Sequence, residues 1–397
     1  MKTFLYKGKT ILSLTLAMSM FCPQAYGGEL ISAAEKETNV QLENPHEAEI
    51  NVLPQLTFEE ALKKVKKNSP DLKDLEETMD MLWDQEEKLE DMGVTYVPNY
   101  DYKHWVPDAW YAATAGLFGV EMGQKQATIG KQLTELGLEV SLKSMFISII
   151  ANEAGLELAK DNAEMQKTLY LQGYTKYRLG MLSKYNLNQL QITYEKAKGS
   201  LEAQELALEQ MYVKLNYMMG TNADQRYQLV YDVEYAPYEL ELTMNQYINA
   251  AMKDDLTIAM MELEVESAKF NRNYVPSSQG GTNTAQLKLT HEQKQRALKT
   301  AKKEKEMLIR NGYLQIKNAE TEYEAAIANL TKAEADYRVA QLNYQAGNVT
   351  KTVVDGAEMG VMQAKLALQG AVYGHELYVF MFENPSLLAD TGAAQQK

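Results

Sequence analysis

The side chains that could bind a metal ion, attack a substrate or transfer a proton are scattered along this chain. The four histidines are His46, His104, His291 and His375, and no two of them are four residues apart. His291-Glu292 begins like a zinc-protease motif, but no second histidine follows at the spacing that this motif requires. The sequence also has no Gly-rich phosphate loop and no serine nucleophile elbow. We therefore expect no metal, no cofactor and no nucleophilic catalysis.

Acidic side chains outnumber basic ones, without a catalytic arrangement. The chain has 54 Asp and Glu against 40 Lys and Arg, which gives a formal net charge of −14. Such a chain repels nucleic acid, because no basic cluster offsets the excess. Carboxylates alternate with lysines, as between Lys299 and Glu306, which is typical of a solvated helix face. Spacing alone does not exclude a pair of catalytic carboxylates, but no motif supports one, and we expect no enzyme.

Residues 1–27 have the pattern of a secretion signal peptide. Three lysines precede an apolar run over residues 10–21, and Ala25-Tyr26-Gly27 places small residues at the cleavage positions. The run of about 12 residues is shorter than the ~20 that span a bilayer as a helix, although a signal anchor is an alternative. Lipidation of Cys22, the only cysteine, is a weaker alternative because the two residues before it are large. We expect an exported chain without disulfides.

Two stretches place small and large residues at alternating spacings of three and four. The first is Ile149, Asn152, Leu156, Ala159, Ala163, Gln166, Tyr170, Gly173, Tyr177 and Gly180. The second is Ile316, Ala319, Tyr323, Ala326, Leu330, Ala333, Tyr337, Ala340, Tyr344 and Gly347. This spacing puts each set on one stripe of a helix, as in a coiled coil. The small residues let a neighbouring backbone approach, and the large residues fill the space beside it. Both patterns predict long helices packed along their lengths.

Each stretch belongs to a longer pattern that occurs twice. A helix start at Leu56-Thr57 recurs at Leu242-Thr243, and each start has a capping-box residue three positions on. A break at 68–72 recurs at 254–256, and Tyr-Val-Pro at 96–98 recurs at 274–276. Long helices are predicted at about 120–179 and 285–346. Both end in the same turn, formed by Tyr177, Gly180 and Ser183 in the first copy and by Tyr344, Gly347 and Thr350 in the second.

The returning helices after these turns carry a second seam each. In the first copy it runs through Leu190, Tyr194, Ala197, Leu201, Gln204, Leu208, Met211, Leu215 and Met218, and in the second through Ala357, Val361, Ala364, Leu368, Ala371, His375, Tyr378 and Phe382. We interpret the pattern as an internal duplication, with repeats at 55–220 and 242–385. Residues 28–54 are predicted to be a flexible leader, 221–241 a linker with a short strand at 227–231, and 386–397 a tail.

The order of these features resembles the TolC-like outer-membrane efflux family over residues 55–385. The features that carry the resemblance are the opening at Leu56, the Asn-Ser-Pro-Asp-Leu break at 68–72, the Tyr-Val-Pro helix ends, the Gly turns and the close of the first repeat at 215–220. The resemblance implies an all-α fold in which two tandem hairpins of long antiparallel coiled-coil helices form part of a trimeric α-barrel. It also implies an exported homotrimer in the outer membrane or envelope, docked on a periplasmic adaptor protein and an inner-membrane transporter. In that family the Gly turns lie at the inner tip of the cylinder, meet the adaptor and form a gate.

The sequence departs from the family pattern in two places. Family members carry a pair of strands between the long helices of each half, and membrane-spanning strands need about 9 to 11 residues each. The segment 94–119 could just hold such a pair, but the segment 275–285 could not, so we expect little or no β-strand and a reduced or absent β-barrel. The family also often has an acid six residues after each turn Gly. Here Asn186 and Val353 take these positions and Asp355 is out of register, so a cation-gating carboxylate ring is not supported.

Segment 94–119 is also rich in aromatic residues. Tyr100, Tyr102, Trp105, Trp110 and Tyr111 are candidates for contact with a membrane or wall interface, where Trp and Tyr are favoured. A loop that folds back on the helix ends is the interpretation that we favour.

The leading functional hypothesis is the passive exit duct of an efflux or secretion system. The alternative is a secreted coiled-coil envelope spacer or adhesin that transports nothing.

Overall fold

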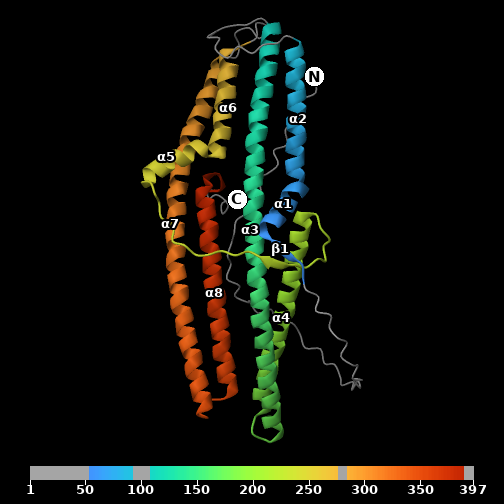
Figure 1. The fold of residues 1–397 in the computed structure, drawn as a ribbon, viewed down its shortest axis with the longest axis vertical. Coiled ribbons are helices and arrows are strands. Elements are labelled where there is room, and N and C mark those ends of the chain that lie inside the picture. Colours follow the sequence, from blue (N-terminus) through green and yellow to red (C-terminus); the bar gives the residue numbers. More distant parts are fainter. Residues whose placement is uncertain (1–52, 93–107, 276–283, 389–397) are drawn as a thin grey trace. The chain divides into compact units, whose positions relative to one another are not determined.

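The chain forms two successive sets of four helices in a computed structural model that describes residues 53–92, 108–275 and 284–388 (Figure 1). The first set is α1 (Phe58–Asn68), α2 (Pro70–Asp91), α3 (Asp108–Arg178) and α4 (Lys184–Met219); the second is α5 (Met244–Asp254), α6 (Leu256–Asn273), α7 (Thr284–Gln345) and α8 (Lys351–Glu383). Short strands β1 (Gln55–Thr57) and β2 (Gln228–Val230) and a 3₁₀ turn, η2 (Pro385–Leu387), complete the described elements. The predicted all-α class with two tandem helical hairpins is confirmed.

Both sets start at a threonine that caps the first helix, as the sequence predicts, but only the second start forms the complete capping box. The Thr57 hydroxyl accepts a hydrogen bond from the backbone N–H of Glu60, 3.3 Å away. At the start of α5, Thr243 and Gln246 form a complete capping box. These bonds satisfy amides that have no partner within the helix. The two helix starts are therefore encoded locally.

The breaks between the short helices are also as predicted. Ser69 ends α1 and caps α2 by accepting the N–H of Leu72, while Pro70 occupies the first helical position, where a missing amide costs nothing. Asp255 has the same double role between α5 and α6, and its Oδ1 accepts the N–H of Ile258 at 2.9 Å. At each break, one residue therefore ends a helix and caps the next.

The helix α3 is longer than the sequence predicts. It begins at Asp108 rather than near residue 120 and has 71 residues, about 106 Å at 1.5 Å per residue. The expectation that 94–119 could hold a pair of strands is therefore wrong for residues 108–119, and residues 94–107 lie outside the described part of the chain. The cause is a packing contact between α2 and α3. Glycines at 116, 123 and 130 of α3 lie beneath Leu89, Leu82 and Leu75 of α2, and an added Cβ at Gly123 would be 3.1 Å from Leu82 Cδ2.

The predicted seams pack the long helices against each other. Seam residues from Ile149 to Gly173 and from Ile316 to Ala340 are buried or half-buried, while most residues between the positions of the second seam are exposed. An added Cβ at Gly173 would lie 2.3 Å from Leu190 Cδ1 of α4, so the small residue makes room for the large one. Three large seam residues are exposed: Tyr177 and Tyr344 next to the turns, and Tyr378, because α8 directs Leu377 and Phe382 into the core instead.

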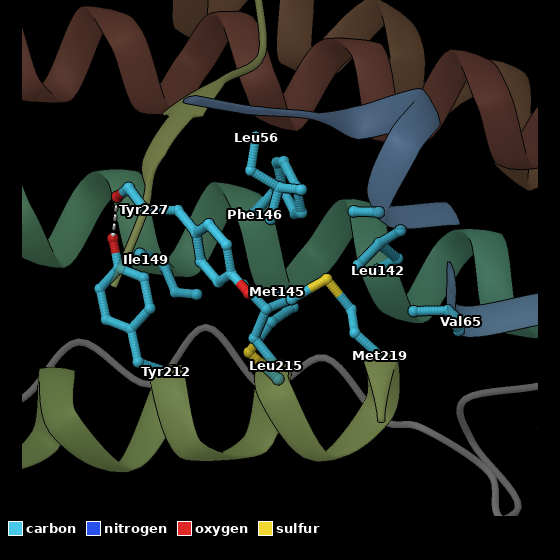
Figure 2. Packing of buried hydrophobic residues seen from close by; sticks show 11 residues of the cluster. Leu56, Val65, Leu142, Met145, Phe146, Ile149, Tyr212, Leu215, Met219 and Tyr227 are labelled. Carbon is cyan, nitrogen blue, oxygen red and sulfur yellow. Dashed lines mark hydrogen bonds between the residues drawn. The ribbon is translucent and has the colours of Figure 1, made fainter. Parts of the chain in front are cut away.

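The predicted strand at 227–231 is confirmed as β2, which pairs in parallel with β1 through Gln55–Gln228, Leu56–Leu229 and Thr57–Val230. Beneath this pair lies the first hydrophobic core, formed by β1, α1, α3, α4 and the linker (Figure 2). Phe146 and Leu215 are fully buried there, and each contributes about 1.5–3 kcal/mol. The Tyr212 hydroxyl donates to the carbonyl oxygen of Tyr227 at 2.9 Å, which fastens the linker to α4.

The two sets of helices contact each other through α3. Along its first half α3 packs with α2 and α6, and along its second half with α4 and α8, while α7 packs with α6 and α8. Phe118 of α3 and Phe270 of α6 are stacked with ring centroids 4.1 Å apart. Among residues 53–92, 108–275 and 284–388, no helix is both long and apolar enough to cross a membrane.

Candidate functional site

Both long hairpins turn at a glycine with left-handed backbone. Gly180 has φ 75° and Gly347 has φ 74°, a conformation that other residues rarely adopt. The N–H of each glycine donates to the carbonyl oxygen of the tyrosine three residues before it, Tyr177 or Tyr344, at 2.9 Å. Because the two turns have the same backbone hydrogen bonds, the six predicted tip residues form two equivalent groups of three.

The third residue of each group differs between the turns. Ser183 caps α4, with its hydroxyl accepting the N–H of Asn186 at 3.2 Å. Thr350 occupies the same position before α8 but makes no side-chain capping hydrogen bond. The turn of the second hairpin is thus held by its backbone alone.

Large apolar side chains surround these turns and are exposed. Leu179 and Met181 in the first turn are 69% and 72% exposed, and Tyr185 follows at 71%. Leu342 and Val353 flank the second turn in the same way. Leu179 and Met181 were not among the predicted site residues. The available signal was their apolar character within a turn, at positions outside the seam. Exposed apolar tips are typical of a surface that another protein covers.

A groove of about 440 Å³ lies between α3 and α8 near the turns. Acidic residues line it from both repeats: Asp161 and Glu164 on α3, and Asp355 and Glu358 on α8. Asp355, which is out of register with the family pattern, therefore faces the first repeat. In the described part of the chain, no group of three or more His, Cys, Asp or Glu is arranged to hold a metal ion.

A lysine at the centre of the molecule joins the two repeats. Lys143 of α3 lies 3.3 Å from a carboxylate oxygen of Glu376 on α8, and its ammonium group lies over three aromatic rings. These rings belong to Phe58 of α1, Tyr231 of the linker and Phe380 of α8, with centroids 4.6–5.6 Å away. Burial raises the pKa of Tyr231, and Lys143 opposes this effect. The cluster fixes the first set of helices against α8 of the second set.

The two histidines within the described residues are buried, and each lies next to a charged side chain of the fold. His291 Nδ1 lies 3.1 Å from Arg272, and burial, followed by that positive charge, lowers its pKa. His375 Nε2 lies 3.8 Å from Glu320, and burial lowers its pKa although Glu320 and Glu376 oppose this. His46 and His104 lie outside the described residues.

The predicted interface aromatics are only partly within the described residues. Tyr100, Tyr102 and Trp105 lie outside them, and Trp110 lies in the first turn of α3, with its side chain undescribed. Tyr111 is half-buried, with its ring centroid 6.5 Å from that of Phe270.

Exposed stripes run along the two helices at the outer edges of the hairpins. The packing order is α4, α3, α8, α7, so α4 and α7 each have one side without a neighbouring long helix. The α4 stripe consists of Tyr185, Ile192, Leu206 and Val213, which are exposed and separated by multiples of seven residues. The α7 stripe consists of Met307, Leu314, Thr321, Ala328, Ala335 and Leu342, exposed at every seventh position. The side chains of the α4 stripe are large, whereas those in the middle of the α7 stripe are small.

This arrangement of two long hairpins with unpartnered edges defines the class of fold. The fold is similar to that of the outer membrane protein VceC from Vibrio cholerae, with a TM-score of 0.60 and 10% identity over 83% of this chain and 96% of that chain. It is also similar to the Campylobacter jejuni CmeC outer membrane channel (TM-score 0.58, 13% identity, 91% and 95% covered) and to the Neisseria gonorrhoeae MtrE outer membrane channel in its open state (0.59, 12%, 83% and 88%).

The chain therefore has a TolC-like fold, as the sequence features indicate. By sequence, no protein family and no curated protein matches it.

Proposed function

We propose that this protein is the exit duct of an efflux or secretion system and works as a homotrimer whose helices enclose a passage through the cell envelope. In this proposal residues 1–27 direct export, and the trimer resides in the outer membrane or at the envelope surface. The similarity of the fold to outer membrane channels supports the proposal. The observation that carries it is the pair of exposed stripes on α4 and α7.

The duplication indicates how the copies would meet. Helices α3 and α7 correspond in the two repeats, as do α4 and α8, and within one chain α8 packs on α3. The corresponding contact places α4 of one copy on α7 of the next. The α4 and α7 stripes differ from each other, so this contact is head-to-tail, and repeated rotation closes it into a ring. Large side chains such as Ile192 would then cover small ones such as Ala328.

The Gly180 and Gly347 turns are the proposed contact with a periplasmic adaptor protein, which in turn joins an inner-membrane transporter. The exposed Leu179 and Met181 support this assignment, since apolar tips gain free energy when a partner covers them. The duct itself is passive: it performs no chemistry, and passage is governed by movement of the hairpin tips.

Light scattering coupled to size exclusion on the mature protein tests the assembly. We expect a trimer, and we expect Leu206→Glu to raise its dissociation constant at least about tenfold by placing a charge in an apolar contact. Leu171→Glu is the control, because Leu171 is similarly exposed but lies on α3. A stable monomer or dimer of the unmodified protein would contradict the duct.

Transport is tested by deleting the gene and measuring drug accumulation and protein secretion. We expect accumulation to rise or secretion to fall, with restoration by the wild-type gene and not by a Leu179→Asp, Met181→Asp variant that still forms trimers. Unchanged accumulation and secretion would favour the envelope spacer or adhesin instead.

A further inference from the structure

The packing of α8 on α3 inside one chain is a template for the contact between α4 and α7 of neighbouring copies. Positions of α7 exceed the equivalent positions of α3 by 316 − 149 = 167, taken from the two Ile residues that open the seams. Positions of α8 exceed those of α4 by the same amount: the left-handed turns give 347 − 180 = 167, and the fully buried Leu215 and Phe382 give 382 − 215 = 167. One offset therefore carries the contacts between α3 and α8 over to α7 and α4.

The central ion pair of the chain has a counterpart of the same sign at the two edges. Inside the chain, Lys143 of α3 lies 3.3 Å from a carboxylate oxygen of Glu376 on α8. The equivalent residues are Arg310 of α7 (143 + 167) and Glu209 of α4 (376 − 167). Both repeats thus have a cation on the ascending helix and a carboxylate at the matching position of the returning helix.

Arg310 and Glu209 are accessible to a second copy. The Arg310 side chain is 43% exposed, against 10% for Lys143, and contacts Glu306 at 2.9 Å and Asn245 at 2.7 Å through its Nη2 atom. Its Nη1 atom makes no hydrogen bond with the described residues, so two of its five N–H donors are available for another carboxylate. Glu209 is exposed and makes no ion pair within residues 53–92, 108–275 and 284–388.

The residues around the central ion pair also have counterparts on the α4 stripe. Phe380, whose ring centroid lies 4.6 Å from Lys143 Nζ, corresponds to Val213 (380 − 167). Tyr373 of α8 corresponds to Leu206 (373 − 167). Val213 and Leu206 are both exposed and lie one turn to either side of Glu209. Apolar side chains that flank an exposed carboxylate in this way are typical of a surface that another chain covers.

A groove beside this region is completed inside the chain in one repeat and left open in the other. The completed groove, of about 350 Å³, has one wall from α1 and α3 and another that includes Asn384 at the end of α8. The open groove, of about 460 Å³, is lined by residues of α5, α6 and α7 alone. Five of its lining residues are equivalent to lining residues of the completed groove: Lys299, Lys302, Lys303 and Glu306 correspond to Gln132, Glu135, Leu136 and Glu139 by the offset of 167, and Met252 corresponds to Lys66 by the offset of 186 (243 − 57) between the N-caps Thr243 and Thr57.

The α4 edge carries a side chain for the missing wall. Tyr217 corresponds to Asn384 (384 − 167) and is 81% exposed. It follows Val213 by four positions, so it continues the α4 stripe towards the end of the helix. A tyrosine at this place can fill an open groove that the smaller asparagine only borders.

We infer that Arg310 of one copy forms an ion pair with Glu209 of the next, and that Tyr217 of this next copy packs into the open groove between α5, α6 and α7. The inference rests on the homotrimeric ring proposed above, and it gives the contact between copies one register. A shift of α4 by one turn would bring Leu206 or Val213 to Arg310 and leave the guanidinium group against an apolar side chain. The occupant of both surfaces is a second copy of this protein.

Charge exchange tests the ion pair in the mature protein, residues 28–397. The single variants are Glu209→Lys and Arg310→Glu, and the exchange variant carries both changes. Trimer dissociation is measured by dilution with light scattering, and folding by circular dichroism. We expect each single variant to raise the concentration at which half of the trimers dissociate at least about tenfold, because it places two like charges in contact. The exchange variant should recover most of this loss. Glu157→Lys, the control, makes the same change in charge on an exposed position of α3 and should assemble as the wild type does.

Cross-linking tests the register directly, because the only cysteine of the sequence is Cys22 and residues 28–397 contain none. A Glu209→Cys, Arg310→Cys variant treated with a short bismaleimide should give covalent trimers on a denaturing gel. The matched Glu157→Cys, Arg310→Cys variant should stay monomeric on the gel. Tyr217→Ala should raise the dissociation midpoint at least about threefold, whereas Tyr174→Ala, an exposed tyrosine of α3, should not.

The outcomes separate this inference from the proposed duct. If trimers form but the exchange variant does not recover and the cysteine pair does not cross-link, the register is wrong while the duct stands. If the wild type forms no trimer, both proposals fail. If a single charge variant does not fold, the cross-linking result decides the question.

Discussion

Replacement of Lys305 by Met should destabilise the protein far more than replacement of Lys302 by Met, three residues earlier on the same helix. Lys305 is 7% exposed in its side chain and pairs at 3.1 Å with Asp255, which is fully buried. Its ammonium group also donates to the carbonyl oxygens of Pro385 and Leu388, at 3.0 and 3.2 Å. It therefore ties the α5–α6 break and the end of the second repeat to α7.

The magnitude follows from what the Lys305→Met variant leaves behind. Oδ1 of Asp255 keeps its donors at the start of α6, but Oδ2 has no hydrogen-bond donor among the described residues and depends on the charge of Lys305. An unpaired buried charge costs about 3–5 kcal/mol, and the donors to Oδ1 place this case near the lower end. Lys302 pairs with Glu262 at 2.7 Å, but both side chains are about half exposed, so its loss costs about 0–1 kcal/mol.

Urea unfolding followed by circular dichroism measures both variants. A second comparison uses the double variant Asp255→Asn, Lys305→Met, because Asn keeps the cap of α6 and removes the stranded charge. We expect the double variant to recover about 1–2 kcal/mol relative to Lys305→Met. Equal losses for Lys302→Met and Lys305→Met, or no recovery in the double variant, would refute the assignment of a buried ion pair to this junction.

Three further predictions concern single residues. Gly347→Ala should lose about 1–2 kcal/mol of stability in urea unfolding because its φ is 74°, whereas Gly356→Ala, inside α8, should be neutral or stabilising. Burial lowers the pKa of His375 in the folded protein, so the unfolded chain binds a proton at a higher pH than the folded chain does. The free energy of unfolding should therefore fall as the pH drops below about 6.5. His375→Phe should make the urea midpoint less dependent on pH between about 7.5 and 5.5. Tyr212→Phe removes the hydroxyl whose proton is shared between the carboxylate of Glu153 and the carbonyl oxygen of Tyr227. It should cost about 1–2 kcal/mol of stability, seen as a lower thermal midpoint. An unchanged midpoint in that variant would mean that the linker is held by other contacts.

The sequence predicts the helix boundaries best where the chemistry is local. Thr57, Ser69 and Thr243 cap helices within three residues of themselves, and Gly180 and Gly347 need only their own backbone conformation. The seams were also predictable, because residues spaced by three and four positions lie on the same side of a helix. These features account for the two hairpins.

The start of α3 could not be read in the same way. Its first turns contain aromatic residues and glycines, which in isolation favour an interface segment or a turn. Their role depends on the leucines of α2, which lie more than 20 residues earlier in the chain: Leu82 fills the space above Gly123. Long-range contacts of this kind have no local sequence signature.

The same limit applies to the charged groups that join distant elements. Lys143 and Glu376 are 233 residues apart, and Asp255 and Lys305 are 50 apart (305 − 255). In the sequence each is one acidic or basic residue among many. Their burial identifies them, and burial is a property of the fold.

The uninterrupted course of α3 has a mechanical consequence. No break divides the 71 residues of α3. One continuous helix therefore connects the segment beside α2 and α6 to the segment beside α4 and α8. A force that tilts the Gly180 turn is thereby delivered to the Phe118–Phe270 stack at the far end. In the proposed duct, a movement of the hairpin tips would therefore also act on the contact between α3 and α6.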